Sequence, residues 1–231
     1  AIIPIGADQS LFSESPVKRR SLNSQSSPRI LYCGNFGNMH DSATLFDYWK
    51  RSDEQRDSSQ WVFHCSGPKQ AELEVVLSEL PVDLKKQIHL GAGLYQAAWI
   101  AAMESADVGL VTMVPGSETV VMPSKTYSAM MAGQAILAIA PEDSDLIDLI
   151  KAADCGWFVE PGDVDGLARV VEAICADPEA LLEKRQNAYL YAQAHLGQDA
   201  LVDDWMRVLR DTNTACSVSY THLRAHETSV D

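Results

Sequence analysis

Short apolar runs alternate with longer amphipathic segments along most of the chain. The apolar runs have the length of β-strands, whereas the segments between them show the three-and-four spacing of helices. A regular strand–helix alternation is typical of βαβ units. From residue 29 onward the sequence therefore predicts an α/β fold, a Rossmann-like and mainly parallel sheet of about six strands with helices on both faces.

The pattern also gives approximate bounds for each element. The apolar runs predict strands at residues 30–33, 61–65, 88–92, 108–113, 135–140 and 156–160. The segments between them predict helices at 40–51, 69–80, 95–105, 125–132, 144–153 and 164–176, followed by two more at 178–195 and 199–211. Ala97, Ile100, Ala101 and Glu104 have the spacing of one helix face, and we expect this face to pack on the sheet.

Composition divides the chain into three parts. Residues 13–28 are polar, rich in serine and bracketed by prolines, so we expect residues 1–28 to be an inter-domain segment with a linker. Residues 29–213 would form the globular domain. Residues 217–231 resemble a translated sequencing adaptor and are expected to be a non-native tail. The chain starts without methionine or a signal-peptide pattern, so we expect an upstream part to be missing.

The overall composition excludes several classes of function. A content of 46% apolar and 22% charged residues is that of a globular protein with a sizeable core. The net charge of -14 disfavours electrostatic binding to nucleic acid or to anionic lipid. The five cysteines show no metal-ligand spacing, so we expect reduced, inert thiols and no metal site. A phosphorylated ligand would have to be held by a local positive site.

A glycine-containing turn follows the first predicted strand. Gly34, Asn35, Phe36 and Gly37 precede a predicted helix, and backbone amides in such a turn suit a pyrophosphate. The turn lacks the third glycine of the dinucleotide fingerprint, and no acidic residue closes the second strand. It is therefore either a phosphate-binding loop or a tight turn without a ligand.

Lys125 is the second candidate for phosphate binding. It lies in the first turn of a predicted helix that Ser124 would cap, next to Thr126. A cation at this position opposes the helix dipole, unless an anion lies between it and the free amides. The alternative is a surface lysine whose small energetic cost is tolerated.

Further candidates lie at the carboxyl ends of strands, where ligands of open parallel sheets bind. Glu118 could accept hydrogen bonds from sugar hydroxyls or be a solvated loop acid, and Tyr95 could stack on a base or simply pack. Asp107 is expected to be a structural turn or cap residue. His64 could line the cleft, although a histidine on a strand is more often a packing residue.

The order and spacing of these segments resemble the carboxy-terminal, donor-binding domain of GT-B glycosyltransferases of retaining family four, including enzymes of bacterial polysaccharide assembly. The resemblance runs from about residue 3 to residue 210. It is carried by the segments IPIGADQSLF, ILYCGNFG, WVFHCSGP, SADVGLVTM, PSKTYSAMMAGQAILAIA and CGWFVEPGDVDGLARVV.

The resemblance implies one half of a GT-B fold, with residues 29–213 binding a nucleotide-diphosphate sugar as the donor. The donor would be the only small-molecule requirement, with no cofactor and no metal. Its partner would be the missing amino-terminal acceptor domain, without which the chain is expected to be inactive. A saccharide or lipid-linked acceptor, a cytoplasmic location and peripheral contact of the parent enzyme with the inner face of the membrane are further expectations.

The resemblance also assigns roles to residues. Lys125 and Glu118 would be catalytic, with Lys125 neutralising charge on the departing nucleotide. The remaining donor-binding residues fall into three groups that would hold the diphosphate (Gly34, Asn35, Phe36, Gly37, Ser124, Thr126), the base (Ser66, Gly67, Leu94, Tyr95) and the sugar (Gly116, Ser117).

The chain departs from the family pattern at several positions. Val120 and Ser128 stand where many members carry two glutamates, and Asn35 and Asn38 lie in the region of a usual arginine and lysine. Two alternatives remain open, and the departures at Val120 and Ser128 would mark lost activity in the second of them. One is a nucleotide-sugar epimerase of the same architecture, and the other is a non-catalytic nucleotide-binding or partner-docking domain.

Overall fold

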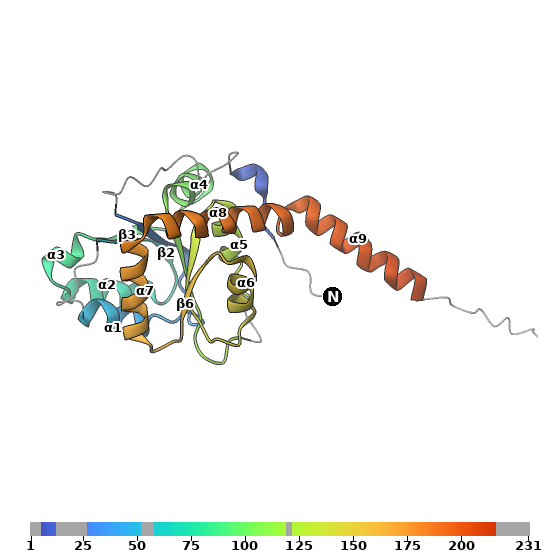
Figure 1. Ribbon diagram of the computed structural model, residues 1–231. Helices are drawn as coiled ribbons and strands as arrows, with labels where there is room; N and C mark the ends of the chain where they lie inside the picture. The colour runs from blue at the N-terminus through green and yellow to red at the C-terminus, as the bar shows by residue number, and fades with distance from the viewer. Residues whose placement is uncertain (1–5, 13–26, 52–57, 119–121, 216–231) are drawn as a thin grey trace, which may run out of the picture.

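A parallel sheet of six strands organises the computed structural model, which describes residues 6–12, 27–51, 58–118 and 122–215 (Figure 1). Its strands are β1 (Arg29–Asn35), β2 (Gln60–Ser66), β3 (Ile88–Ala92), β4 (Val108–Thr112), β5 (Ala135–Ile139) and β6 (Gly156–Val159). Their spatial order is β3-β2-β1-β4-β5-β6, and each pair of neighbours is parallel. The predicted Rossmann-like α/β fold is confirmed.

Helices connect the strands as the pattern predicted, with small shifts at their ends. The helical elements are η1 (Gln9–Leu11), α1 (Ala43–Arg51), α2 (Gln70–Glu79), α3 (Val82–Lys85), α4 (Gln96–Ser105), α5 (Lys125–Met131), α6 (Asp145–Ala153), α7 (Val164–Ala176), α8 (Pro178–His195) and α9 (Gln198–Ala215). The short elements η1 and α3 were not predicted. Helices α7 and α8 begin and end where the sequence placed them, because Asp163 and Asp177 cap their first turns.

The two faces of the sheet bury separate cores, since successive side chains of a strand point to opposite faces. Ile30 and Tyr32 of β1 face the core formed with α1, α2 and α7, whereas Leu31 faces the core formed with α5, α6 and α8 (Figure 1). The buried strands β4 and β5 have no exposed residue. Helices thus cover both faces, as expected for a parallel sheet.

Helix α4 packs differently from the prediction. Ala97 and Ala101 are exposed, and the helix instead contacts its core through Met103, which is buried, and through Trp99 and Ile100, which are partly buried. The predicted face was right for Ile100 but wrong for Ala97 and Ala101, because alanine is compatible with both exposure and burial and so does not identify the core side of a helix. The larger side chains decided the orientation.

A buried ion pair ties α8 to the sheet. Asp107, directly before β4, accepts a hydrogen bond from the Arg29 amide at 2.9 Å, and its other oxygen lies 3.1 Å from Nη1 of Arg185 on α8. Arg185 also donates through Nε to the carbonyl oxygen of Gly133 at 2.9 Å. Both charged side chains are fully buried. The structural role predicted for Asp107 is confirmed.

Gly156 allows β6 to approach β5 closely. A Cβ atom at this position would lie 2.0 Å from the carbonyl oxygen of Ile136, its partner in the strand register. We therefore expect Gly156→Ala to lower the free energy of unfolding by about 1–3 kcal/mol, because the backbone of β5 must move. Urea unfolding measures the change. Gly93→Ala is the control, because its Cβ would meet only Ser66 Oγ at 3.9 Å; equal stability of both variants would contradict the prediction.

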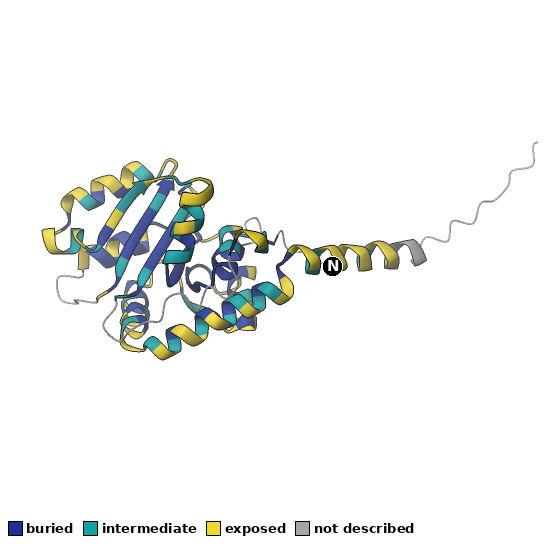
Figure 2. Cartoon of the chain, turned by 90° about the horizontal axis from the view of Figure 1, so that it is seen from above, coloured by how far each residue is buried: buried dark blue, intermediate teal, exposed yellow. Residues whose placement is uncertain are grey.

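Helix α9 extends away from the body of the domain (Figures 1 and 2). Val202, Trp205, Met206 and Leu209 are exposed on it at the spacing of a single helix face. The described part of the chain contains no helix that combines the length and the apolar character required to cross a bilayer.

Candidate functional site

The candidate site lies where the strand order reverses, between the carboxyl ends of β1 and β4. In open α/β sheets this switch point is where ligands bind. Here the loops that follow the two strands are joined by hydrogen bonds. The Val114 amide donates to the carbonyl oxygen of Met39 at 3.1 Å, and Nδ1 of His40 lies 2.8 Å from the carbonyl oxygen of Thr112. The turn after β1 is therefore fixed against the end of β4.

Lys125 reaches across this junction from the start of α5. Its Nζ atom lies 2.8 Å from the Tyr32 hydroxyl, 3.2 Å from Nε2 of His40 and 3.3 Å from the carbonyl oxygen of Asn35. The same atom lies 4.4 Å from the centre of the Tyr32 ring, in cation–π geometry. The two segments predicted to hold a diphosphate, after β1 and at the start of α5, are thus side by side.

The environment of Lys125 disfavours its charge. Burial lowers the pKa of Lys125 from 10.5 to about 8, partly offset by the nearby Cys33 and Cys65. None of the ion pairs formed by the described residues includes Lys125. A desolvated ammonium without a carboxylate partner attracts an anion strongly.

The neighbours of Lys125 are neutral groups. Burial, followed by the charge of Lys125, lowers the pKa of His40 from 6.5 to about 4, although the Thr112 carbonyl opposes this shift. Burial raises the pKa of the Tyr32 hydroxyl above its usual range. Tyr32 is fully buried, and its ring packs on Phe63 with centroids 5.8 Å apart. The aromatic core thus fixes the hydroxyl that contacts the ammonium.

Two of the predicted donor-binding residues do not offer the free amides that the sequence suggested. The Phe36 amide donates to the carbonyl oxygen of Ser66 at 2.6 Å, and the Thr126 amide donates to that of Pro123 at 3.0 Å. The Phe36 side chain is also fully buried. Of the four residues 34–37, only Phe36 belongs to the core, because a large apolar ring is more stable there than in a polar loop.

The loop after β2 contacts the turn after β1. Gly67 has φ +117°, and a Cβ atom there would lie 2.4 Å from Oδ1 of Asn35, so both the backbone conformation and the space favour glycine. Ser66 and Gly67 are exposed. Beside them, Lys69 donates to Oγ of Ser42 at 3.0 Å. This loop brings a second cation to the same edge of the sheet.

The aromatic candidate for base stacking is mostly exposed. Tyr95 is 82% exposed directly before α4, so most of its ring is accessible to a ligand in this structure. Leu94 beside it is half-buried. An exposed tyrosine at the carboxyl end of β3 is available to contact a planar ligand.

In the loop after β4, some polar groups have hydrogen-bond partners among the described residues and others have none. Ser117 is buried, and its hydroxyl donates to the carbonyl oxygen of Val114 at 2.7 Å, whereas Gly116 is exposed. One carboxylate oxygen of Glu118, Oε2, is buried and has no hydrogen-bond partner among the described residues. The hydroxyls of Thr112 and Thr126 are in the same situation. Unsatisfied polar atoms therefore concentrate between β4 and α5.

Two further predictions concern the start of α5 and the departures from the family pattern. Helix α5 begins at Lys125 as predicted, but the Ser124 side chain makes no capping hydrogen bond and is exposed. Ser128 is half-buried on α5, whereas Val120 lies outside the described residues.

The four described cysteines are free thiols, and burial raises the pKa of Cys65 to about 11 and that of Cys155 to about 12. Thiols with raised pKa are inert at neutral pH, as predicted. Within the described ranges, no group of three or more His, Cys, Asp or Glu side chains could hold a metal ion.

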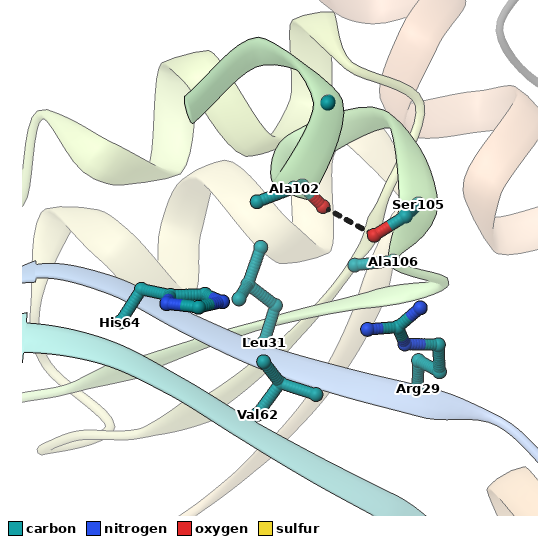
Figure 3. A pocket seen from close by; sticks show the side chains of 8 residues that line it. Arg29, Leu31, Val62, His64, Ala102, Ser105 and Ala106 are labelled. Atoms are coloured by element: carbon teal, nitrogen blue, oxygen red, sulfur yellow. Dashed lines mark hydrogen bonds between the residues drawn. The ribbon is translucent and has the colours of Figure 1, made fainter. Parts of the chain in front are cut away.

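A cavity of about 230 Å³ lies elsewhere, between the sheet and α4 (Figure 3). It is lined by Arg29, Leu31, Val62, His64, Ala101, Ala102, Ser105 and Ala106. His64 thus lines a cavity, but none of the lining residues contacts Lys125. Nδ1 of His64 lies 3.3 Å from the carbonyl oxygen of Ala92, and burial lowers the pKa of His64. The cavity therefore lies under α4 and not among the loops at the carboxyl ends of β1 and β4 that surround Lys125.

Three residues of the site were not predicted from the sequence. They are Tyr32, His40 and Lys69, which lie respectively within β1, in the loop that follows it and at the start of α2. Their positions at or near the carboxyl ends of strands were a usable signal for His40 and Lys69. Tyr32 gave no such signal, since an aromatic residue within a strand is normally part of the core.

The fold and this junction define a Rossmann-like domain with a candidate anion site at its switch point. The sequence model described as "Glycosyl transferases group 1" matches residues 27–177. The chain belongs to this family of glycosyltransferases. A protein of Pseudomonas aeruginosa described as "Probable glycosyltransferase WbjE" is 29% identical over 96 residues, which cover 38% of this chain and 24% of that protein.

Several solved structures share the fold. The sucrose-phosphate synthase of Thermosynechococcus elongatus matches with a TM-score of 0.67 and 20% identity, over 93% of this chain and 53% of that one. Anabaena HepE in complex with UDP-glucose matches with a TM-score of 0.70 and 15% identity, over 91% and 57%. The chain thus spans little more than half the length of these structures, and these similarities show the fold alone.

Proposed function

We propose that this chain is the donor-binding domain of a retaining GT-B glycosyltransferase of family four. It would bind a nucleotide-diphosphate sugar and support transfer of the sugar to a saccharide or lipid-linked acceptor. The observation that carries the proposal is Lys125, a largely buried cation at the switch point with no carboxylate partner among the described residues. The related HepE structures, which contain UDP and UDP-glucose, support a nucleotide sugar as the ligand.

The diphosphate would lie between Lys125 and the turn after β1. Lys125 and Lys69 supply positive charge at this edge, where the protein otherwise carries a large negative net charge. The exposed or half-buried residues Gly34, Asn35 and Gly37 line the turn, and Ser124 lies at the start of α5. A local pair of cations is what an acidic protein needs in order to retain an anion.

The remaining parts of the donor would extend to either side. The base would contact Ser66, Gly67, Leu94 and Tyr95, with the exposed Tyr95 ring as the stacking surface. The sugar would face Gly116 and Glu118, and Oε2 of Glu118 would accept from a sugar hydroxyl. Ser117 would act through its carbonyl oxygen, because both its hydroxyl and its amide donate to the carbonyl oxygen of Val114.

In the proposed reaction, the bond between the anomeric carbon and the diphosphate oxygen breaks. The acceptor hydroxyl oxygen then bonds to that carbon on the same face and gives its proton to the departing diphosphate oxygen, so the configuration of the carbon is retained. Lys125 would stabilise the negative charge that develops on the departing phosphate, and a preorganised ammonium provides this stabilisation without reorganising solvent. Neither a metal nor a cofactor is part of the proposal.

The acceptor would be bound by the other half of the GT-B architecture. The chain covers between 53% and 57% of the related structures named above, so we expect it to bind the donor but not to turn it over alone. For the complete enzyme we propose a cytoplasmic reaction, with peripheral contact at the inner membrane face where the acceptor is lipid-linked. A non-catalytic nucleotide-binding domain is the second candidate, favoured by Ser128 at a position where many members of the family carry glutamate.

Calorimetric titration with UDP-glucose, GDP-mannose and ADP-glucose tests the donor proposal. We expect one of them to bind, most tightly below pH 8, and to bind more weakly as Lys125 loses its proton above its pKa of about 8. A bound diphosphate stabilises the ammonium, so binding near pH 8 should take up a proton. Titrations in two buffers of different ionisation enthalpy measure that uptake. Binding that is independent of pH between 7 and 9.5 would contradict the role of Lys125.

A further inference from the structure

The ammonium of Lys125 is held entirely by groups that carry no charge. Its three contacts are the Tyr32 hydroxyl, the Asn35 carbonyl and the His40 ring. A lysine ammonium has three N–H donors, so these three acceptors match its donor capacity. Such an arrangement orients the cation without neutralising it, whereas a carboxylate in the same place would compete with an anionic ligand.

The proton on the His40 ring can be assigned from its short contact with Thr112, although the Asn35 carbonyl also lies within hydrogen-bonding reach of the ring. Nδ1 lies 2.8 Å from the Thr112 carbonyl oxygen, which can only accept, so Nδ1 carries the proton. Nε2 then carries the lone pair, and it accepts from Lys125 at 3.2 Å. Two successive hydrogen bonds thus connect the Lys125 amine, through the imidazole of His40, to the carbonyl of Thr112 at the end of β4. His40 therefore couples the orientation of the amine to the main chain of the central sheet.

The backbone around His40 is also fixed. The His40 amide donates to the carbonyl oxygen of Gly37 at 3.1 Å, and the preceding residue, Met39, accepts from the Val114 amide. The ring itself contacts Tyr32 edge-on, with centroids 5.6 Å apart. His40 thus has a fixed backbone, a fixed ring and a fixed tautomer, as a residue that orients another side chain requires.

We propose that His40 is a positioning residue that holds the charged Lys125 amine toward the turn after β1, ready to take the diphosphate of the donor. The proposal rests on the proposed function of the site. The Asn35 contact is the longest of the three, and Asn35 also accepts from the Tyr32 hydroxyl at 2.7 Å. A phosphate oxygen would replace this contact, while Tyr32 and His40 retain the amine.

The titratable groups that interact with Lys125 in the described part of the chain are consistent with this role. Tyr32 and Cys33 on β1 and Cys65 on β2 stay protonated and neutral at pH 7, because burial raises the pKa of each. His40 remains neutral at that pH because its pKa is lowered. Lys69 adds a second positive charge at the start of α2. Between about pH 5 and pH 8, Lys125 is therefore the group at the centre of the cluster whose charge a ligand meets.

Two substitutions of His40 distinguish the effect of its hydrogen bond to Lys125 from the effect of its ring packing. His40→Gln keeps an acceptor at about the reach of Nε2, whereas His40→Leu removes it while filling a similar volume. We expect His40→Leu to weaken binding of the best-bound nucleotide sugar about tenfold, the effect of losing one hydrogen bond to a charged group, and His40→Gln to restore most of it. His195→Leu, at the exposed end of α8, is the matched control and should bind normally.

The titration of Lys125 supplies a measurement that does not need the ligand. NMR of the ligand-free protein with 13C-labelled lysine follows the pKa of Lys125. The Lys125→Met variant assigns the Lys125 resonance. His40→Leu should move that pKa further below 8, and His40→Gln should return it toward the wild-type value. Thermal unfolding of each variant shows whether the fold is kept.

The outcomes distinguish the two proposals. Unchanged affinity and unchanged Lys125 titration in His40→Leu would overturn the positioning role, as would an equal loss in the leucine and glutamine variants with the fold intact. If no nucleotide sugar binds the wild-type chain while the Lys125 pKa still responds to His40, the donor function and the role in ligand capture fail. The coupling of His40 to Lys125 would then stand alone as a structural property.

Discussion

Lys125→Met is expected to weaken nucleotide-sugar binding by roughly 100-fold, the effect of removing a buried charge that contacts an oppositely charged partner. Stability should change much less. In the wild-type protein, burial of the Lys125 ammonium destabilises the folded state, since it lowers the Lys125 pKa from 10.5 to about 8. The substitution removes this cost but also the bonds to Tyr32 and His40. We therefore expect a loss of no more than about 1 kcal/mol in unfolding free energy.

The pH dependence of stability provides a second check on the same residue. Below pH 8 the lysine is protonated in both the folded and the unfolded chain, so the desolvation cost is fully present. Between pH 8 and 10.5 only the unfolded chain retains the proton, so this residue's contribution to stability rises with pH. In Lys125→Met, this increase in stability between pH 8 and 10.5 should be absent. Lys151→Met is the control, because Lys151 pairs with Glu142 at the surface and should affect neither binding nor the pH profile.

Similar affinity of wild type and Lys125→Met, measured by calorimetry at pH 7, would contradict the anion site. It would also remove the main argument for a diphosphate ligand, because Lys69 alone would then supply positive charge among the described residues of the site. A parallel loss in Lys151→Met would instead indicate a general electrostatic effect of net charge.

Arg185→Met is expected to lower the free energy of unfolding by about 3–5 kcal/mol. The substitution removes the positive charge that faces Asp107 at 3.1 Å and the Nε donor to Gly133, while both partners stay buried. An uncompensated carboxylate in the interior is costly, since it cannot regain its hydration. Urea unfolding followed by circular dichroism measures the loss.

A double variant tests this explanation. Asp107→Leu combined with Arg185→Met removes both charges and should recover part of the lost stability, because apolar side chains can replace a buried ion pair. Lys184→Met is the neighbouring control on α8, and its partner Asp154 is largely exposed. A loss below about 1 kcal/mol for Arg185→Met would show that the pair is not a main support of the fold.

The sequence predicted the elements of the fold better than their limits. All six strands were found, but β1 continues to Asn35 because its register with β2 extends to Ser66, and this pairing is a tertiary property. Helix α1 begins at Ala43 rather than at residue 40. His40 is drawn to Thr112, and Asp41 accepts the Thr44 amide as a cap. The order of the strands could not be predicted, since hydrophobic pattern shows burial but not which strand is the neighbour.

The candidate site was predicted only in outline. The position of Lys125 next to a glycine turn followed from the rule that ligands meet the carboxyl ends of strands. The surroundings of its amine did not follow, because Tyr32, Asn35 and His40 are 85 to 93 positions away in sequence. Phe36 was predicted to line a phosphate loop, although its ring belongs to the core. Its apolar side chain could have indicated burial from the sequence.

The strand order has a consequence for how the domain is assembled and held. Strands β1, β2 and β3 are contiguous in the chain and can pair early, whereas β1 meets β4 only after the residues between Arg29 and Asp107, 78 positions apart, have been made. The seam between the two halves of the sheet should therefore close late in folding. A ligand bridging the turn after β1 and helix α5 spans this seam, so its binding energy would oppose separation of the halves and protect the whole domain against unfolding.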